Sequence, residues 1–152
     1  MYRVDDVLRD GNLGGRAGAD ALCPASANRP AGSANAHAFI SVAAGDAIAD
    51  MPGNYGVPTT GTISGPTGTL IANNWVDLLD GSISVDLQTA GVLGAATLHW
   101  FTGSNADGSL SAFNCSGWTS NAGAVQSTTG RRDRTDNTWI DFLNPFCNNT
   151  YP

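Results

Sequence analysis

The chain of 152 residues has the length of one domain, and its 41% hydrophobic content is enough to build a core. It has no lysine and no glutamate: the seven cationic residues are all arginine, the thirteen anionic residues are all aspartate, and the net charge is −6. An acidic chain without a basic face argues against nucleic acid as a partner. No segment approaches the ~18 apolar residues of a membrane span, so we expect no membrane insertion.

The first half of the chain predicts two helices and one strand. Apolar spacing favours a helix over 17–28, which we expect to kink or end at Pro24 because its ring would clash with the preceding turn. Residues 37–42 form an apolar run typical of a buried strand, and 43–51 indicate a weak helix. Residues 52–70 are rich in glycine and proline and predict a loop.

The clearest local signal lies in 74–81. Asn74 can cap a helix there, Trp75 and Leu78 fall on one apolar face, and Gly81 follows as a stop. Further strands are predicted at 83–87, 97–102, 115–120 and 138–143. Since glutamate and lysine favour exposed helix faces, their absence also predicts a protein rich in loops and strands.

The three cysteines, Cys23, Cys115 and Cys147, indicate an exported protein, as do the absent lysine and the polar composition. An odd number leaves a free thiol, an intermolecular bridge or a missing partner. We expect a secreted or cell-surface protein from which a leader has been removed ahead of Met1.

Four motifs in order resemble the bacterial secreted endostatin-like domain family, and also endostatin itself. The resemblance covers nearly the whole chain, and the cysteines occur at the matching places relative to the motifs. The matching segments are 14–23, 38–41, 57–58 with 74–82, and 100–108 with 115–120.

The resemblance implies an α+β fold of C-type-lectin-like type, with a twisted, mostly antiparallel sheet, two short helices and long loops. It implies a disulfide between Cys115 and Cys147, which would contribute about 3–4 kcal/mol. Cys23 would pair with a cysteine beyond Cys147, but the chain ends at Pro152. We therefore expect a single domain over 1–152 that lacks its last strand and final cysteine. Cys23 is then an unpaired thiol, or else an intermolecular one.

Cys23, His37 and His99 are the residues with which a nucleophilic site could be built. Each lies in an apolar run, and nothing in the sequence places a base beside a nucleophile. We expect no enzyme and no cofactor.

The metal signals are weak. The spacing of cysteines and histidines gives no zinc signature. Residues 104–108 resemble half of a calcium loop, with Asn105 and Asp107 as candidate ligands, but the acidic closure is missing. A plain turn is the better interpretation, and we expect no metal.

The candidate ligand contacts are Trp139 and the basic cluster of Arg131, Arg132 and Arg134. Helical periodicity places Trp75 in the core, and the resemblance implies that Trp100 and Trp118 pack around the cysteines. Trp139 lies in a polar stretch and is the least constrained. The arginines suit an acidic glycan or protein, although a solvated loop is the better interpretation of this cluster.

The resemblance favours an extracellular binding or adhesion module that recognises a glycan or protein through its loops. The alternative is a structural subunit of an extracellular filament, sheath or phage fibre. In that case the partners are neighbouring copies of the chain, since a Gly/Ala/Ser/Thr-rich surface suits dense assembly.

Overall fold

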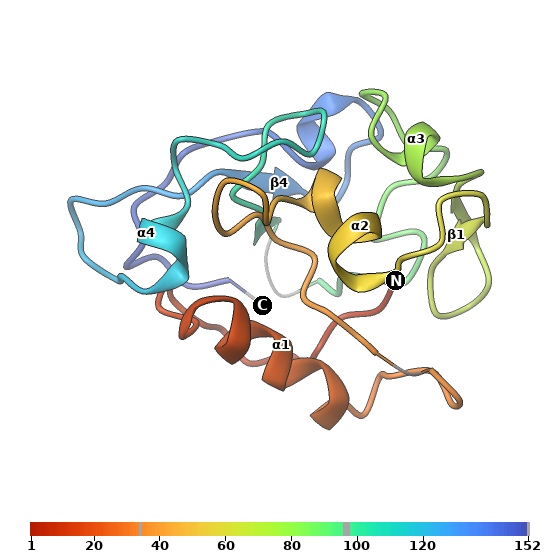
Figure 1. Ribbon diagram of the computed structural model, residues 1–152, viewed down its shortest axis with the longest axis horizontal. Coiled ribbons are helices and arrows are strands. Elements are labelled where there is room, and N and C mark those ends of the chain that lie inside the picture. Colours follow the sequence, from red (N-terminus) through yellow and green to blue (C-terminus); the bar gives the residue numbers. More distant parts are fainter. Residues whose placement is uncertain (34, 96–97, 152) are drawn as a thin grey trace.

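Short helices and strands joined by long loops make up residues 1–33, 35–95 and 98–151, which the computed structural model describes. They form a small mixed α/β domain (Figure 1). In chain order the elements are α1 (Gly15–Ala25), η1 (Ile48–Asp50), α2 (Met51–Tyr55), β1 (Ile63–Ser64), β2 (Leu70–Ala72), α3 (Trp75–Leu78), β3 (His99–Phe101), α4 (Cys115–Trp118), β4 (Thr129–Arg131) and η2 (Asn137–Trp139).

The strands form two separate antiparallel pairs, β1 with β2 and β3 with β4. In the second pair Trp100 lies opposite Gly130, whose missing side chain lets the Trp139 carbonyl and the Trp100 indole approach. The α+β class is thus confirmed, but the single twisted sheet is not seen in the described residues, where isolated bridges extend the small pairs.

Helix α1 begins after Gly14, which has a left-handed backbone with φ of +79°. Gly18 must lack a side chain, because a Cβ there would lie 2.1 Å from the Leu13 carbonyl oxygen. The helix ends at Ala25, directly after Pro24, as its sequence predicted.

Residues 37–42 are not part of a named strand, contrary to the prediction from their apolar run. The Arg16 guanidinium of α1 donates to the carbonyls of Ala38 and Ile40, both at 2.7 Å. It also forms two hydrogen bonds to the Asp46 carboxylate. A side chain therefore satisfies carbonyls that a neighbouring strand would otherwise bind.

The remaining predictions have mixed outcomes. The Asn74 cap is confirmed, since its Oδ1 accepts from the Asp77 amide at 3.0 Å, but α3 ends at Leu78. The strand predicted at 115–120 is wrong: this segment is the tight turn α4, with left-handed backbone at Ser116 and Gly117. The strand predicted at 138–143 is replaced in its first part by η2.

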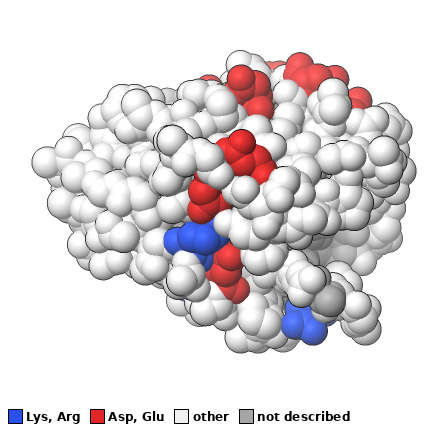
Figure 2. All heavy atoms as spheres, viewed as in Figure 1, with Lys and Arg blue, Asp and Glu red and all other residues white. Residues whose placement is uncertain are grey.

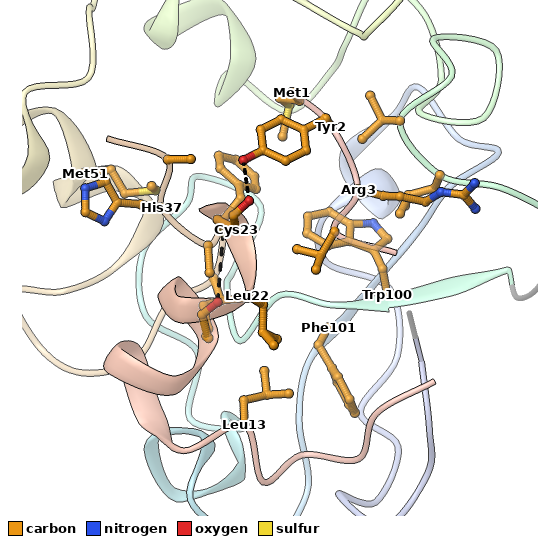
Figure 3. Close-up of a pocket in the computed structure, with 18 of the residues that line it drawn as sticks. Met1, Tyr2, Arg3, Leu13, Leu22, Cys23, His37, Met51, Trp100 and Phe101 are labelled. Carbon is orange, nitrogen blue, oxygen red and sulfur yellow. Dashed lines mark hydrogen bonds between the residues drawn. The ribbon is translucent and has the colours of Figure 1, made fainter. Parts of the chain in front are cut away.

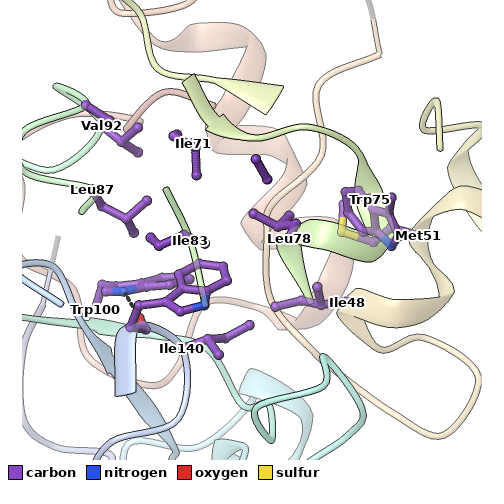
Figure 4. Packing of buried hydrophobic residues seen from close by; sticks show 13 residues of the cluster. Ile48, Met51, Ile71, Trp75, Leu78, Ile83, Leu87, Val92, Trp100 and Ile140 are labelled. Atoms are coloured by element: carbon purple, nitrogen blue, oxygen red, sulfur yellow. Dashed lines mark hydrogen bonds between the residues drawn. The ribbon is translucent and has the colours of Figure 1, made fainter. Parts of the chain in front are cut away.

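The buried hydrophobic residues form two clusters. The larger cluster gathers residues from the middle and end of the chain (Figure 4). Its buried members are Ile48, Met51, Ile71, Ala72, Trp75, Leu78, Ile83, Leu87, Ala90, Val92, Trp100, Trp139 and Ile140. The smaller cluster consists of Ala19, Ile40, Phe101, Cys115, Trp118 and Cys147.

Candidate functional site

The predicted disulfide between Cys115 and Cys147 is confirmed. It closes a sequence separation of 32 residues, and both cysteines are fully buried in the smaller cluster. Gly11 packs directly against it, because a Cβ at that position would lie 2.2 Å from Cys115 Sγ. The disulfide therefore links two segments that are distant in the sequence, and a third segment packs against it at Gly11.

Residues 125–129 run between 113–115 on one side and 143–147 on the other. The Thr128 amide donates to the Phe113 carbonyl at 2.7 Å, and the Cys115 amide to the Gln126 carbonyl at 3.1 Å. On the opposite side, the Cys147 amide donates to the Val125 carbonyl at 2.8 Å. We call these three segments the disulfide-linked layer.

Two exposed phenylalanines lie on this layer, Phe113 at 39% and Phe146 at 49% exposure. The register pairs Phe146 with Gln126, and the bridge between residues 114 and 127 places Phe113 opposite Thr128. Because Gln126 and Thr128 are two residues apart in an extended segment, both phenylalanines belong to the same face.

Two amide side chains, Gln126 and Asn144, lie on the same face as these aromatic positions. Gln126 Nε2 donates to the backbone carbonyl of Asn144 at 2.6 Å, and Thr128 Oγ1 donates to Asn144 Oδ1 at 3.0 Å. We call Phe113, Gln126, Asn144 and Phe146 the Phe113–Phe146 face. None of these four residues is charged, and the Cys115–Cys147 disulfide joins the two segments that carry the phenylalanines.

The prediction that Trp139 is the least constrained tryptophan is wrong. Trp139 is fully buried in the larger cluster, where it stacks with Phe39 and Trp100. Asp136 caps η2 by accepting from the Thr138 amide, so the polar residues before Trp139 make a turn that directs the indole inward. The side chain offers no surface for stacking on a sugar.

The structure also separates the predicted arginine contacts. Arg131 forms hydrogen bonds to Asp133 at 2.7 and 3.1 Å and lies over the Phe142 ring. Arg132 is buried and donates to the Gly94 carbonyl, which removes it from ligand contact. Arg134 is exposed. The three do not form one basic patch.

The two candidate calcium ligands serve as turn residues. Asp107 Oδ1 accepts from the amide and the hydroxyl of Ser109 at 3.0 and 2.6 Å, and these bonds lower the Asp107 pKa. Asn105 Nδ2 donates to Ser109 Oγ and to the Leu110 carbonyl. Within the described ranges, no group of three or more His, Cys, Asp or Glu residues could hold a metal ion.

Cys23 is a free, buried thiol on α1. Its Sγ lies 3.9 Å from the Ala19 carbonyl oxygen, and burial, with a further contribution from Asp20, raises its pKa to about 11. His37 Nδ1 is 2.8 Å from Asp20 Oδ2, and its ring stacks on Tyr55. An activated cysteine needs a lowered pKa, so this environment acts against nucleophilic chemistry.

His99, the second histidine, lies on β3 between the rings of Phe142 and Tyr151, with centroids 5.6 and 5.9 Å away. Burial lowers its pKa, and the nearby Arg131 charge acts in the same direction. The neutral form is therefore favoured, as expected for a packed ring.

An apolar cavity of about 320 Å³ lies beside α1 and is partly open to solvent (Figure 3). Residues of both clusters line it, together with the first residues of the chain. Its walls include Tyr2, Leu13, Leu22, Cys23, His37, Phe39, Met51, Trp75, Leu87, Trp100 and Phe101. A cavity of this size and polarity is suited to a small organic ligand.

Most of the surface is uncharged on the side shown in Figure 2, where acidic side chains outnumber basic ones. Among the described residues, no helix is both long and apolar enough to cross a membrane.

No protein-family model and no curated protein matches this chain. The resemblance to the endostatin-like family therefore stays a prediction, and functional arguments rest on the geometry of this chain.

Phe113, Phe146 and Arg16 are structurally informative residues that sequence reasoning missed. Phe113 stands two residues before Cys115 and Phe146 directly before Cys147. Their position next to the cysteines of an expected disulfide was the available signal that the two phenylalanines would lie close together. Nothing in the sequence signalled the carbonyl contacts of Arg16, since they join segments more than twenty residues apart.

Proposed function

We propose that this protein is an extracellular binding module of the endostatin-like, C-type-lectin-like type, and that its Phe113–Phe146 face binds an uncharged glycan. The observation that carries the proposal is the pair of exposed phenylalanines on the disulfide-linked layer, with Gln126 and Asn144 on the same face.

The chemistry of this face suits a neutral sugar. The C–H side of a sugar ring is apolar and packs against an aromatic face, which gains free energy from burying both surfaces. Side-chain amides both donate and accept hydrogen bonds, as sugar hydroxyls do. Gln126 and Asn144 already bond to the layer, so their positions are largely set before a ligand arrives. No charge of the face itself selects for an acidic glycan.

Binding is a better account than catalysis because the reactive side chains are poorly placed for chemistry. The Cys23 thiol, with its pKa of about 11, is almost entirely protonated at neutral pH. His37 is engaged with Asp20 and Tyr55.

The same element supports secretion or surface display. Disulfides form and persist in oxidising compartments, and the Cys115–Cys147 bridge holds the proposed binding face in place. An oxidising compartment would therefore preserve the covalent bond on which the proposed function depends.

The test is binding of the protein to an array of neutral glycans, repeated with Phe113→Ala and Phe146→Ala. Each substitution should weaken the strongest signal about tenfold or more, which corresponds to about 1.4 kcal/mol. The matched control is Val76→Ala, an apolar truncation at a side chain that is 75% exposed and lies on α3. It should leave binding unchanged.

Two results would contradict the proposal. One is glycan binding that neither phenylalanine substitution affects. The other is the absence of any neutral-glycan signal together with binding to a protein ligand through the same face, which would reassign the face to a protein interface.

A further inference from the structure

The apolar cavity beside α1 lies between the two hydrophobic clusters. Met51, Trp75 and Trp100 of the larger cluster line it, as do Cys23 and Phe101 of the smaller cluster. Protein interiors are normally close-packed, with few voids larger than a water molecule. An apolar cavity of about 320 Å³ is therefore suited to an apolar guest.

A second, more polar groove adjoins this cavity and shares part of its wall. Arg9, Leu13 and Leu22 line both spaces, and Asp10, Asn12 and Thr150 line only the groove. Figure 3 shows Leu13 and Leu22 toward one end of the cavity, with Met1 and Tyr2 at the other. The two spaces together present an apolar interior and a polar outer end.

The charges at the groove disfavour an anionic group. Both terminal nitrogens of the Arg9 guanidinium bind the Asp5 carboxylate at 2.7 Å, and this contact lowers the Asp5 pKa. The Asp10 carboxylate accepts from the Asn12 amide and from Asn121 Nδ2. An anion would therefore compete with Asp5 for the Arg9 guanidinium and would be repelled by the Asp10 carboxylate. A hydroxyl can instead donate to Asp10 or bond to the Thr150 side chain.

We propose that the cavity binds the single hydrocarbon chain of a small amphiphile and that an uncharged, hydroxyl-bearing head lies in the groove of Asp10 and Thr150. This site is separate from the Phe113–Phe146 face and does not depend on the function proposed for it.

The probe is 1-monododecanoylglycerol, used below its micelle-forming concentration. Two readouts follow its binding: isothermal titration calorimetry, and the rate at which Cys23 reacts with 4,4′-dithiodipyridine. Cys23 lines the cavity and is the one thiol outside the disulfide, so an occupied cavity should slow that reaction several-fold.

The variant Leu22→Asp places a carboxylate at the junction of cavity and groove and should weaken probe binding tenfold or more. Its matched control is Ala21→Asp, the adjacent and exposed position of α1, which should leave binding unchanged. A second variant, Ala36→Phe, adds a ring to the half-buried cavity wall and should also weaken binding. Circular dichroism verifies that each variant is folded.

Head-group specificity is tested with dodecanoate and dodecylamine, which carry the same chain length with opposite charges. The glycerol ester should bind most tightly of the three. Tighter binding of either charged probe would overturn the head-group assignment, and absence of binding by all three would overturn the site. If Leu22→Asp and Ala36→Phe both left binding unchanged, the probe would bind outside this cavity, and the proposal would be overturned.

Phe113→Ala and Phe146→Ala should not alter binding of the glycerol ester. Failure of the cavity proposal and failure of the glycan proposal are thus distinguishable.

Discussion

The two hydrophobic clusters are stabilised by different means. The larger cluster holds thirteen buried residues, and aliphatic and indole side chains from α3, β3 and η2 pack against one another there. The smaller cluster holds six buried residues, two of which are the halves of the disulfide. A small core buries little apolar surface, so a covalent bond between its segments contributes a larger share of its stability. The proposed binding face lies on the covalently linked side.

Removal of the disulfide should have the largest effect. Cys115→Ser combined with Cys147→Ser should lower the free energy of unfolding by about 4 kcal/mol, because the closed loop of 32 residues no longer restricts the unfolded chain. Urea unfolding of the variant, and of the reduced wild type, measures this loss. The serine variant should lose at least as much as the reduced wild type, because it also buries two hydroxyl groups in an apolar cluster. A loss below about 1 kcal/mol in the reduced wild type would show that packing alone supports the smaller cluster.

In the larger cluster, truncating a buried side chain should lower the free energy of unfolding far more than truncating an exposed one. Leu78 is fully buried, and Leu78→Ala should cost about 3 kcal/mol through lost burial and the cavity left behind. Val76→Ala on the same helix should change stability by less than about 0.5 kcal/mol, since Val76 is exposed. Equal losses in urea unfolding would mean that α3 does not anchor this cluster.

The smaller cluster should instead be sensitive to added volume. Gly11→Ala should cost about 2 kcal/mol, because its Cβ would overlap Cys115 Sγ. Gly53→Ala is the matched control: it lies in α2 with nothing within 4 Å of the added methyl group. That control should be neutral or slightly stabilising, since glycine is unfavourable in a helix. If Gly11→Ala left the free energy of unfolding unchanged, the backbone beside the disulfide would be able to shift at little cost.

The last pair of substitutions removes two helix caps, one on each side of the comparison. Asn74→Ala should cost about 1 kcal/mol through loss of its bond from the Asp77 amide. Asn114 caps α4 by accepting from the Gly117 amide and also donates to the Val42 carbonyl at 3.0 Å. Its replacement by alanine should cost about 2 kcal/mol, since it leaves two backbone groups without that partner. The reverse order in thermal unfolding would contradict the description of α4.

Local signals allowed part of this fold to be predicted from the sequence. The Asn74 cap and the end of α1 next to Pro24 depend on residues a few positions apart, and both agree with the structure. The Cys115–Cys147 pairing was implied by the resemblance to the endostatin-like family, and the bond is present.

The errors arose where distant contacts decide the outcome. Trp139 stands among polar residues in the sequence, but packing against Phe39 and Trp100 makes it a core residue. The run at 37–42 has the apolar character of a strand, but Arg16 of α1 binds two of its carbonyls. Likewise, Phe113 and Phe146 come to one face only through their shared pairing with 126–128.

The most direct test of the central claim compares two destabilised proteins under conditions where both remain folded. One is Cys115→Ser with Cys147→Ser, which frees the disulfide-linked layer, and the other is Leu78→Ala, which weakens the larger cluster. The measurement is the affinity of each for the neutral glycan that binds wild type most strongly. The structure predicts a loss of about tenfold or more for the cysteine variant and wild-type affinity for Leu78→Ala. Unchanged affinity in the folded cysteine variant would contradict the claim that the disulfide holds the binding face.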